Sequence, residues 1–208
     1  MIRPETPRRC AWPTDDPLYV EYHDTEWGRP TTDPIRLFEK LCLEGFQSGL
    51  SWITILRKRD NFRAAFDGFD PEQIASYGEG DVERLLGDAG IIRHRGKIEA
   101  TVNNAQRAIE LVEAEGSLVD WIWGWAVETP ERTDDTDGGG DAGIPAMTER
   151  SKALSKELKR RGWKFVGPTT AYAFMQSEVL TNDHADHCFV HDECAAARTA
   201  FLADRTLR

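Results

Sequence analysis

The sequence predicts a predominantly helical chain, and three observations support this. Asp-Pro pairs begin at Asp16, Asp33 and Asp70, and Asp at the N-cap followed by Pro at the first helical position is a typical helix start. Apolar residues then recur at helical spacing, as in LFEKLCLEG from Leu37. No segment up to Gly78 alternates apolar and polar residues with the period of two expected of a half-buried strand.

The 208 residues suffice for one sizeable core, and we expect residues 1–208 to form a single two-lobed domain. The net charge is −10, but basic segments at 57–63, 93–97 and 152–164 can still present a positive face to nucleic acid. No apolar run is long enough to span a membrane and no secretory signal is evident. We therefore expect a cytoplasmic protein without membrane contact, whose four cysteines are thiols or metal ligands.

The first predicted helix follows Asp16 and places Tyr19, Tyr22 and His23 on one face. The second follows Asp33 and ends just before Gly45, which puts Glu44 at its C-terminal end. A short helix runs from Trp52 to Lys58.

Residues 42–56 are apolar apart from one carboxylate, that of Glu44, and contain Gly45 and Gly49. A buried carboxylate must be paired or functional. If the stretch is kinked at its glycines, Trp52 can form one wall of a pocket in which Glu44 is the polar group that recognises a ligand. The alternative is that Glu44 caps a helix and Trp52 is ordinary core.

Residues 81–88 and 98–116 predict two helices joined by a turn that contains Gly90. This is the form of a helix-hairpin-helix unit, whose backbone N–H groups can bind a DNA phosphate. Arg93, Arg95 and Lys97 would add contacts to the flanking phosphates. An ordinary helix turn remains the alternative.

The rest of the chain predicts a tryptophan-rich core helix at 117–125 and a flexible acidic surface loop at 128–147. A basic amphipathic helix closed by Gly162 follows, then a buried helix that starts near Pro168. We expect residues 195–208 to form a mobile tail.

Cysteine and histidine gather near both ends of the chain. Cys10 and His23, with His184 and Cys188 on one helical turn, make a Cys2His2 set, the closed tetrahedral donor set of structural zinc. Such an ion would pin the two ends together. His187, His191 and Cys194 are spare ligands that could replace one of the four, and isolated surface thiols and histidines would also explain the pattern.

Together these residues resemble the type I 3-methyladenine DNA glycosylase family, on the stretches CAWPTDDPLYVEYHDTEWG, LFEKLCLEGFQSGLSWITILRKR, DVERLLGDAGIIRHRGKI, SKELKRRGWKFVGPTTAYAFMQ and NDH followed by Cys188. The resemblance implies an all-α, helix-hairpin-helix, monofunctional glycosylase with a zinc ion that joins the N- and C-terminal segments. It places the zinc ligands on Cys10, His23, His184 and Cys188. It places the base-reading acid on Glu44, the stacking aromatics on Tyr22 and Trp52, and the lesion-facing loop on Gly49 and Leu50. Tyr19, which shares a helical face with Tyr22, is a further candidate for base binding.

The expected function is therefore removal of 3-methyladenine from alkylated double-stranded DNA, by a monomer that hydrolyses the N-glycosidic bond and leaves an abasic site. IEATVNNAQRAIE, which follows Lys97, offers no convincing Asp or Lys for attack on the sugar, as the resemblance implies. Two other classes of protein remain alternatives. A metal-dependent hydrolase would need an open metal site, and a non-catalytic DNA-binding module would lack a base pocket.

Overall fold

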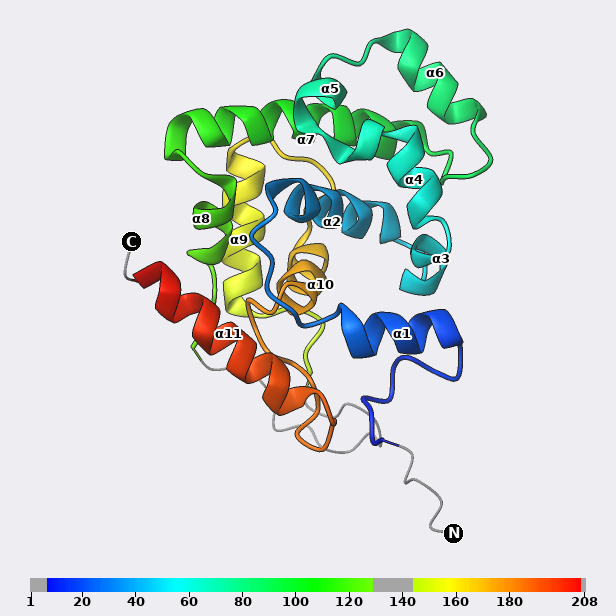
Figure 1. The fold of residues 1–208 in the computed structure, drawn as a ribbon. Coiled ribbons are helices and arrows are strands. Elements are labelled where there is room, and N and C mark those ends of the chain that lie inside the picture. Colours follow the sequence, from blue (N-terminus) through cyan, green and yellow to red (C-terminus); the bar gives the residue numbers. More distant parts are fainter. Residues whose placement is uncertain (1–6, 129–143, 207–208) are drawn as a thin grey trace. The chain divides into compact units, whose positions relative to one another are not determined.

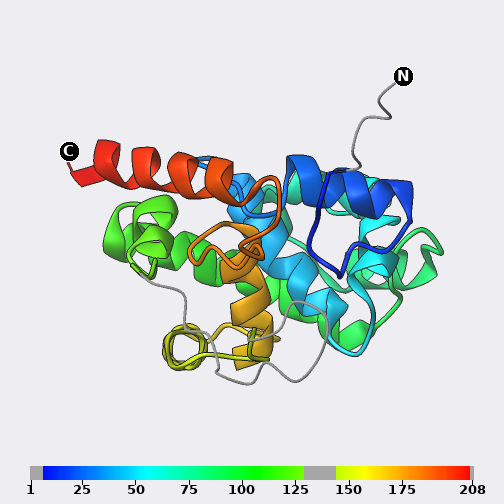
Figure 2. The same cartoon turned by 90° about the horizontal axis from the view of Figure 1, so that it is seen from below.

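The computed structural model describes residues 7–128 and 144–206. Figures 1 and 2 show helices and loops, with no strand among the described residues, which confirms the all-α expectation. In chain order the elements are α1 (Pro17–Thr25), α2 (Pro34–Gln47), α3 (Trp52–Leu56), α4 (Arg59–Ala65), a 3-10 turn η1 (Asp67–Phe69), α5 (Pro71–Ala75), α6 (Glu79–Gly87), α7 (Arg95–Glu115), α8 (Leu118–Trp123), α9 (Glu149–Arg160), α10 (Pro168–Ser177) and α11 (His191–Thr206). Within this described part, no helix has both the length and the apolar character needed to cross a bilayer.

The described residues group into two compact units. Unit 1 takes its residues from Met1–Pro30, Ala126–Ala146 and Met175–Arg208, and unit 2 from Thr31–Trp125 and Met147–Phe174.

The three Asp-Pro helix starts are confirmed. The Asp16 and Asp33 carboxylates each accept from two backbone N–H groups in the first turns of α1 and α2, and the Asp70 carboxylate accepts from the Glu72 N–H of α5. Each cap is typically worth about 1 kcal/mol. Local chemistry therefore sets these three starts.

The core of unit 2 forms where α2 packs against α7 and against the α3–η1 segment (Figure 1). Nearly every residue of α2 from Leu37 to Phe46 is buried. Phe46 lies 4.6 Å from Phe62 between ring centroids, and Phe62, Phe66 and Phe69 are also fully buried. Such close packing fixes the C-terminal half of α2, which carries Glu44.

The predicted end of α2 before Gly45 is wrong, because the helix continues to Gln47. Gly45 is accommodated inside the helix by a neighbour: an added Cβ would lie 3.3 Å from both the Cβ and the carbonyl oxygen of Phe165. The chain turns instead at Gly49, whose φ of 81° lies in the left-handed region that favours glycine.

Helices α6 and α7 are joined by a short turn, as the predicted hairpin requires. Its Gly90 amide is already used, since it donates to the Asp88 carboxylate at 2.7 Å. The Lys58 ammonium binds the Gly90 carbonyl at 3.1 Å. A Cβ on Gly90 would lie 3.1 Å from the Cβ of Asn61, so a close approach of the chain requires glycine here.

Lys97 differs from its expected role as a phosphate ligand. It is 7% exposed, and its ammonium donates to the carbonyls of Phe46 at 2.8 Å and Ser48 at 2.6 Å. Carbonyls at a helix C-terminus lack partners within the helix, and Lys97 supplies one for the end of α2. Its side chain therefore ties α7 to α2, and its ammonium does not point to solvent.

Unit 1 brings together segments that are distant in the sequence. Backbone bonds join Phe189 to Arg8 at 2.9 Å and Gly28 to Ser177 at 3.0 Å. Arg198 of α11 donates to the carbonyl of Val179 at 2.9 Å. Residues 195–206 of the expected tail belong to α11, and their mobility stays a prediction. Most of the acidic loop predicted at 128–147 lies outside the described residues.

We predict that Lys97→Met lowers the free energy of unfolding by about 1.5–3 kcal/mol, the range for hydrogen bonds to a charged group. Urea denaturation measures this change. Lys152→Met is the control, since Lys152 is an exposed lysine and a surface change of this kind stays within about 0.5 kcal/mol. Unchanged stability together with a weaker salt dependence of DNA binding would restore the phosphate role.

Candidate functional site

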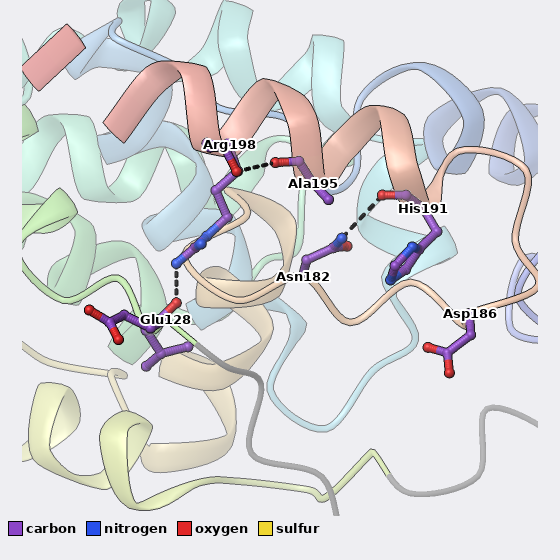
Figure 3. A pocket seen from close by; sticks show the side chains of 8 residues that line it. Glu128, Asn182, Asp186, His191, Ala195 and Arg198 are labelled. Atoms are coloured by element: carbon purple, nitrogen blue, oxygen red, sulfur yellow. Dashed lines mark hydrogen bonds between the residues drawn. The ribbon is translucent and has the colours of Figure 1, made fainter. Parts of the chain in front are cut away.

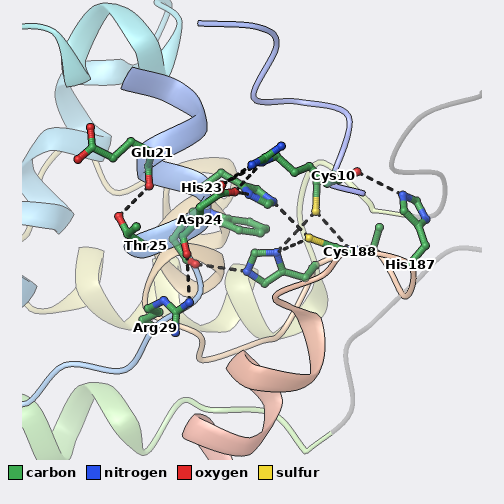
Figure 4. Close-up of polar contacts among 12 residues, drawn as sticks. Cys10, Glu21, His23, Asp24, Thr25, Arg29, His187 and Cys188 are labelled. Atoms are coloured by element: carbon green, nitrogen blue, oxygen red, sulfur yellow. Dashed lines mark hydrogen bonds and ion pairs between the residues drawn. The ribbon is translucent and has the colours of Figure 1, made fainter. Parts of the chain in front are cut away.

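The predicted metal ligands Cys10, His23, His184 and Cys188 converge in unit 1, and their ligand atoms all lie within 4.8 Å of one another (Figure 4). Cys188 Sγ lies 3.5 Å from His23 Nε2 and 3.6 Å from His184 Nδ1, and Cys10 Sγ lies 3.6 Å from the same nitrogen. The two histidines are 0% exposed and the two cysteines 4%.

These separations fit a tetrahedral ion. With metal–sulfur and metal–nitrogen bonds of about 2.3 and 2.05 Å, tetrahedral angles place sulfur and nitrogen about 3.5 Å apart. Two thiolates and two imidazoles complete the coordination, so no position remains for water or substrate. The cluster can therefore hold a metal ion in a structural role.

Each histidine is oriented by a second partner. His23 Nδ1 lies 2.8 Å from the Asp24 carboxylate, and His184 Nε2 lies 3.3 Å from the Trp27 carbonyl. Such partners fix the tautomer that leaves the other ring nitrogen free for metal. Burial lowers the pKa of His184 to about 4, aided by the neighbouring His23. His184 is thus neutral at physiological pH, as a metal ligand must be.

Two further residues support this cluster. Arg9 binds both oxygens of the Asp24 carboxylate, at 2.8 and 2.7 Å. Burial acts to raise the pKa of Asp24, but the hydrogen bonds from Arg9 and His23 outweigh it and lower the pKa. At Gly28 an added Cβ would lie 2.6 Å from His184 Nε2, and φ is 77°, so this position requires glycine.

The expected helical turn at His184–Cys188 is wrong, because this segment has a bend at His184 and a turn at 186–187 in place of a helix. One turn is closed by the Cys188 amide, which donates to the Ala185 carbonyl at 2.7 Å. The spare ligands His187, His191 and Cys194 lie outside the cluster. Asp24, Arg9 and Gly28 were not predicted, although Asp24 directly follows a predicted ligand.

Glu44 lies on α2 in unit 2 and is 4% exposed. Its Oε2 is buried and has no hydrogen-bond partner, which is costly for a carboxylate oxygen. Glu44 lines a cavity of about 370 Å³ together with Gln47, Ser48, Gly49, Leu50, Thr169, Thr170 and Ala173. An unsatisfied acceptor thus borders a space of ligand size.

Lys40 was not among the predicted site residues, but it contacts both residues of unit 2 that were predicted to bind the base, Glu44 and Trp52. Its ammonium lies 2.9 Å from Glu44 Oε1 and 3.3 Å from the ring centroid of Trp52. Burial raises the pKa of Glu44, and the Lys40 charge opposes this. The four-residue spacing of Lys40 and Glu44 on a predicted helix was a signal for this pair.

The predicted DNA-binding residues differ in availability. Leu50 is 42% exposed beside Gly49. Arg93 is exposed, with no ion pair or hydrogen bond of its side chain among the described residues. Arg95 is exposed but surrounded by acid: it pairs with Glu79 at 2.9 Å and with Glu83, and lies 3.6 Å from Glu99.

Tyr19 and Tyr22 lie on α1 in unit 1. Tyr22 is 4% exposed and Tyr19 is half-buried. Both pack edge-on against Trp12: the ring centroid of Tyr19 lies 4.9 Å from that of Trp12, and the ring centroid of Tyr22 lies 6.3 Å from it. Trp12 also packs against the ring of His23, so this aromatic group adjoins the metal cluster.

A further cavity of about 380 Å³ lies in unit 1 beside α11 (Figure 3). Charged and polar groups dominate its described lining, among them Glu128, Asp186 and Arg198, and no Phe, Tyr or Trp is present. The lining of the cavity beside Glu44 has no aromatic residue either, but none of the carboxylates that line the unit 1 cavity has a buried oxygen without a hydrogen-bond partner.

Comparison with known proteins gives a consistent result. The profile of the family described as methyladenine glycosylase matches residues 12–191. DNA-3-methyladenine glycosylase 1 of Escherichia coli (strain K12) is 52% identical over 180 residues, which cover 86% of this chain and 95% of that protein. DNA-3-methyladenine glycosylase of Haemophilus influenzae is 46% identical over 180 residues, covering 86% and 96%.

Solved structures agree. A crystal structure of 3-methyladenine DNA glycosylase I matches with a TM-score of 0.81 and 50% identity, covering 88% of this chain and 100% of that one. A structure of 3-methyladenine DNA glycosylase I from Staphylococcus aureus matches with a TM-score of 0.78 and 36% identity, and the match covers 87% of this chain and 95% of that one. That structure was described as the structural basis of 3-methyladenine recognition by the Staphylococcus aureus enzyme. The chain therefore belongs to the methyladenine glycosylase family.

Proposed function

We infer that this protein is a DNA repair glycosylase that excises 3-methyladenine from alkylated DNA. The two relatives named above bear that name, and this chain matches each of them over nearly its whole length. The observation that carries the inference within this chain is Glu44, a buried carboxylate with an unpartnered oxygen at the edge of a cavity.

Cleavage of this glycosidic bond needs little help from a general acid or from a nucleophile of the protein. Methylation at N3 makes the nucleotide's adenine cationic, so the base is already a good leaving group. The bond between N9 and C1′ breaks, its electron pair goes to N9, and the base leaves neutral. Water adds to C1′ and its proton passes to solvent. The enzyme must mainly extrude the nucleotide, at a cost of a few kcal/mol, and hold the base in a selective pocket.

We propose that Glu44 selects the lesion by charge and by hydrogen bonding. A carboxylate in a low-dielectric site attracts a cation strongly, and Oε2 can accept from the exocyclic amine. Trp52 would supply an aromatic face, which attracts a cationic ring by about 0.5–2 kcal/mol. A stacking role for Tyr22 rests on the family resemblance, and Tyr22→Phe and Tyr22→Ala would test it; base contact by Tyr19 stays a prediction.

For DNA we propose that Leu50, exposed beyond Gly49, meets the lesion site and that Arg93 contacts phosphate. The Gly90 amide and the Arg95 guanidinium have partners within the protein, so their expected DNA contacts would require those partners to be exchanged. We also propose that the protein acts as a cytoplasmic monomer.

We propose that the ion in the Cys10–His23–His184–Cys188 cluster is Zn²⁺. The S2N2 donor set suits zinc, and its closed tetrahedron supports a cross-link between distant segments of unit 1. Base release requires no step at this ion. Catalysis by metal-bound water would need an open position.

The direct test of function is release of 3-methyladenine from methylated DNA, followed by chromatography of the free base. Release with an abasic site left in the strand is expected. DNA binding without release would favour a non-catalytic module instead.

For Glu44→Gln we predict weaker binding of a cationic base by about 1.5–3 kcal/mol, the range for charge-assisted hydrogen bonds, with affinity for undamaged DNA nearly unchanged. The probe is 3,9-dimethyladeninium, in which a methyl group replaces the sugar and fixes the positive charge. Calorimetry compares it with neutral 9-methyladenine. Because the change leaves Lys40 buried without its carboxylate, Lys40→Met/Glu44→Gln serves as a second background. Equal affinities and unchanged release rates in both backgrounds would make Glu44 a structural residue.

For the metal we predict that wild-type protein contains close to one zinc ion per chain, and that chelation or Cys188→Ala lowers the melting temperature, with activity lost only as folding is lost. Cys194→Ala removes a buried thiol of the same unit that is not in the cluster, and should keep the zinc. A metal-free protein that stays folded at full activity would refute the assignment.

For DNA binding we predict that Arg93→Ala weakens affinity for lesion-bearing and undamaged DNA alike, and reduces the salt slope by about 1. Arg95→Ala should change the slope less, because three carboxylates already neutralise its charge. A larger loss for Arg95→Ala would show that it exchanges these partners for phosphate.

A further inference from the structure

Lys40 occupies a place unusual for a lysine. It is 7% exposed, and it contacts two groups that are as deeply buried, Glu44 at 4% and Trp52 at 7% exposed. The ammonium lies 2.9 Å from the carboxylate and 3.3 Å from the centre of the indole ring. A cation thus rests on an aromatic face while bound to a carboxylate.

A second buried acid on the same helix, Glu39, has hydrogen bonds on both of its carboxylate oxygens. Its two oxygens accept hydrogen bonds from Arg63 Nε, at 2.9 Å for Oε1 and 3.1 Å for Oε2. Glu44 receives Lys40 on Oε1 only, while Oε2 stays buried and unpartnered. A buried ion pair stabilises a fold when its remaining lone pairs are satisfied. The pair at Glu44 is incomplete in this sense, and Glu44 lines the cavity.

We propose that Lys40 is a resident cation that competes with the base for Glu44 and Trp52, and that the cationic lesion displaces it. The proposal rests on the proposed function. An N3-methylated adenine in DNA needs the same two partners as the ammonium: a carboxylate acceptor and an aromatic face. Two positive charges in one small buried site repel each other. The flexible stem of lysine allows its ammonium to leave.

Charge then decides which bases enter and which leave. A cationic base replaces the charge that Lys40 withdraws, so Glu44 stays neutralised. A neutral adenine would leave the buried carboxylate without a counter-charge, which is costly. Cleavage makes the base neutral, because the electron pair of the broken bond stays on N9. Lys40 can then return to Glu44 and help to expel the product.

The experiment compares wild type with Lys40→Met and Lys40→Arg. Methionine keeps the length of the side chain and removes the charge, whereas arginine stacks on aromatic rings and binds carboxylates on two oxygens. Calorimetry with 3,9-dimethyladeninium should give roughly tenfold tighter binding for Lys40→Met and weaker binding for Lys40→Arg. Inhibition of base release by free 3-methyladenine should strengthen about tenfold in Lys40→Met.

The matched control is Arg63→Met, which breaks the half-buried ion pair between Arg63 of α4 and Glu39 of α2. It should lose stability but keep wild-type affinity for the probe, which separates a role in the pocket from a role in folding. If Lys40→Met does not fold, the order of wild type and Lys40→Arg still tests the proposal.

Equal or weaker binding by Lys40→Met, or a base-bound structure with the ammonium still on Trp52, would overturn this inference. If wild type releases the base while Lys40→Met shows no gain, only the inference fails. If no variant binds the probe and wild type releases no base, the proposed function fails and the inference falls with it.

Discussion

A carboxylate that is shielded from water must be balanced by positive charge, and the organisation of unit 2 depends on this constraint. Glu44 is held in place because α2 is buried along most of its length, against α7 and the phenylalanine cluster of α4 and η1. Burial raises its pKa, and the Lys40 ammonium works in the opposite direction. The aromatic core therefore does more than stabilise the fold, since it also holds a buried carboxylate at the edge of a cavity.

The C-terminal end of α2 is also held in place by a contact from another helix. Lys97 reaches from α7 to the carbonyls of Phe46 and Ser48, and the chain then reverses at Gly49. Three cations of this unit, Lys40, Lys97 and Arg95, are held by partners within the protein. Two of these cations, Arg95 and Lys97, belong to the basic segment that follows the hairpin turn. Charge in the sequence does not equal charge available to DNA, and the exposed Arg93 is the better phosphate candidate.

In unit 1 a different interaction joins distant segments. Two thiols and two imidazoles approach at the separations that a tetrahedral zinc ion imposes. Asp24, Arg9 and the Trp27 carbonyl orient the imidazoles, and Gly28 leaves room for one of them. Because His23 directly follows Tyr22 on α1, an ion at this cluster would also restrain that aromatic side chain.

The sequence by itself determined what depends on local chemistry or on residue type. Asp16, Asp33 and Asp70 marked helix starts because capping needs only a carboxylate and the following turn. The four metal ligands could be named because few residue types bind zinc, and Glu44 was notable as a lone carboxylate in an apolar stretch.

Tertiary structure decided what depends on neighbours distant in the sequence. Gly45 did not end α2, because Phe165 packs against it and requires its small size. Gly90 faces Asn61 in the same way, and Lys97 found carbonyls on another helix instead of solvent. Lys40 contacts Trp52 only because α3 brings the indole ring against α2. Periodicity identifies the buried face of a helix, but the contacts made by that face depend on how the helices pack.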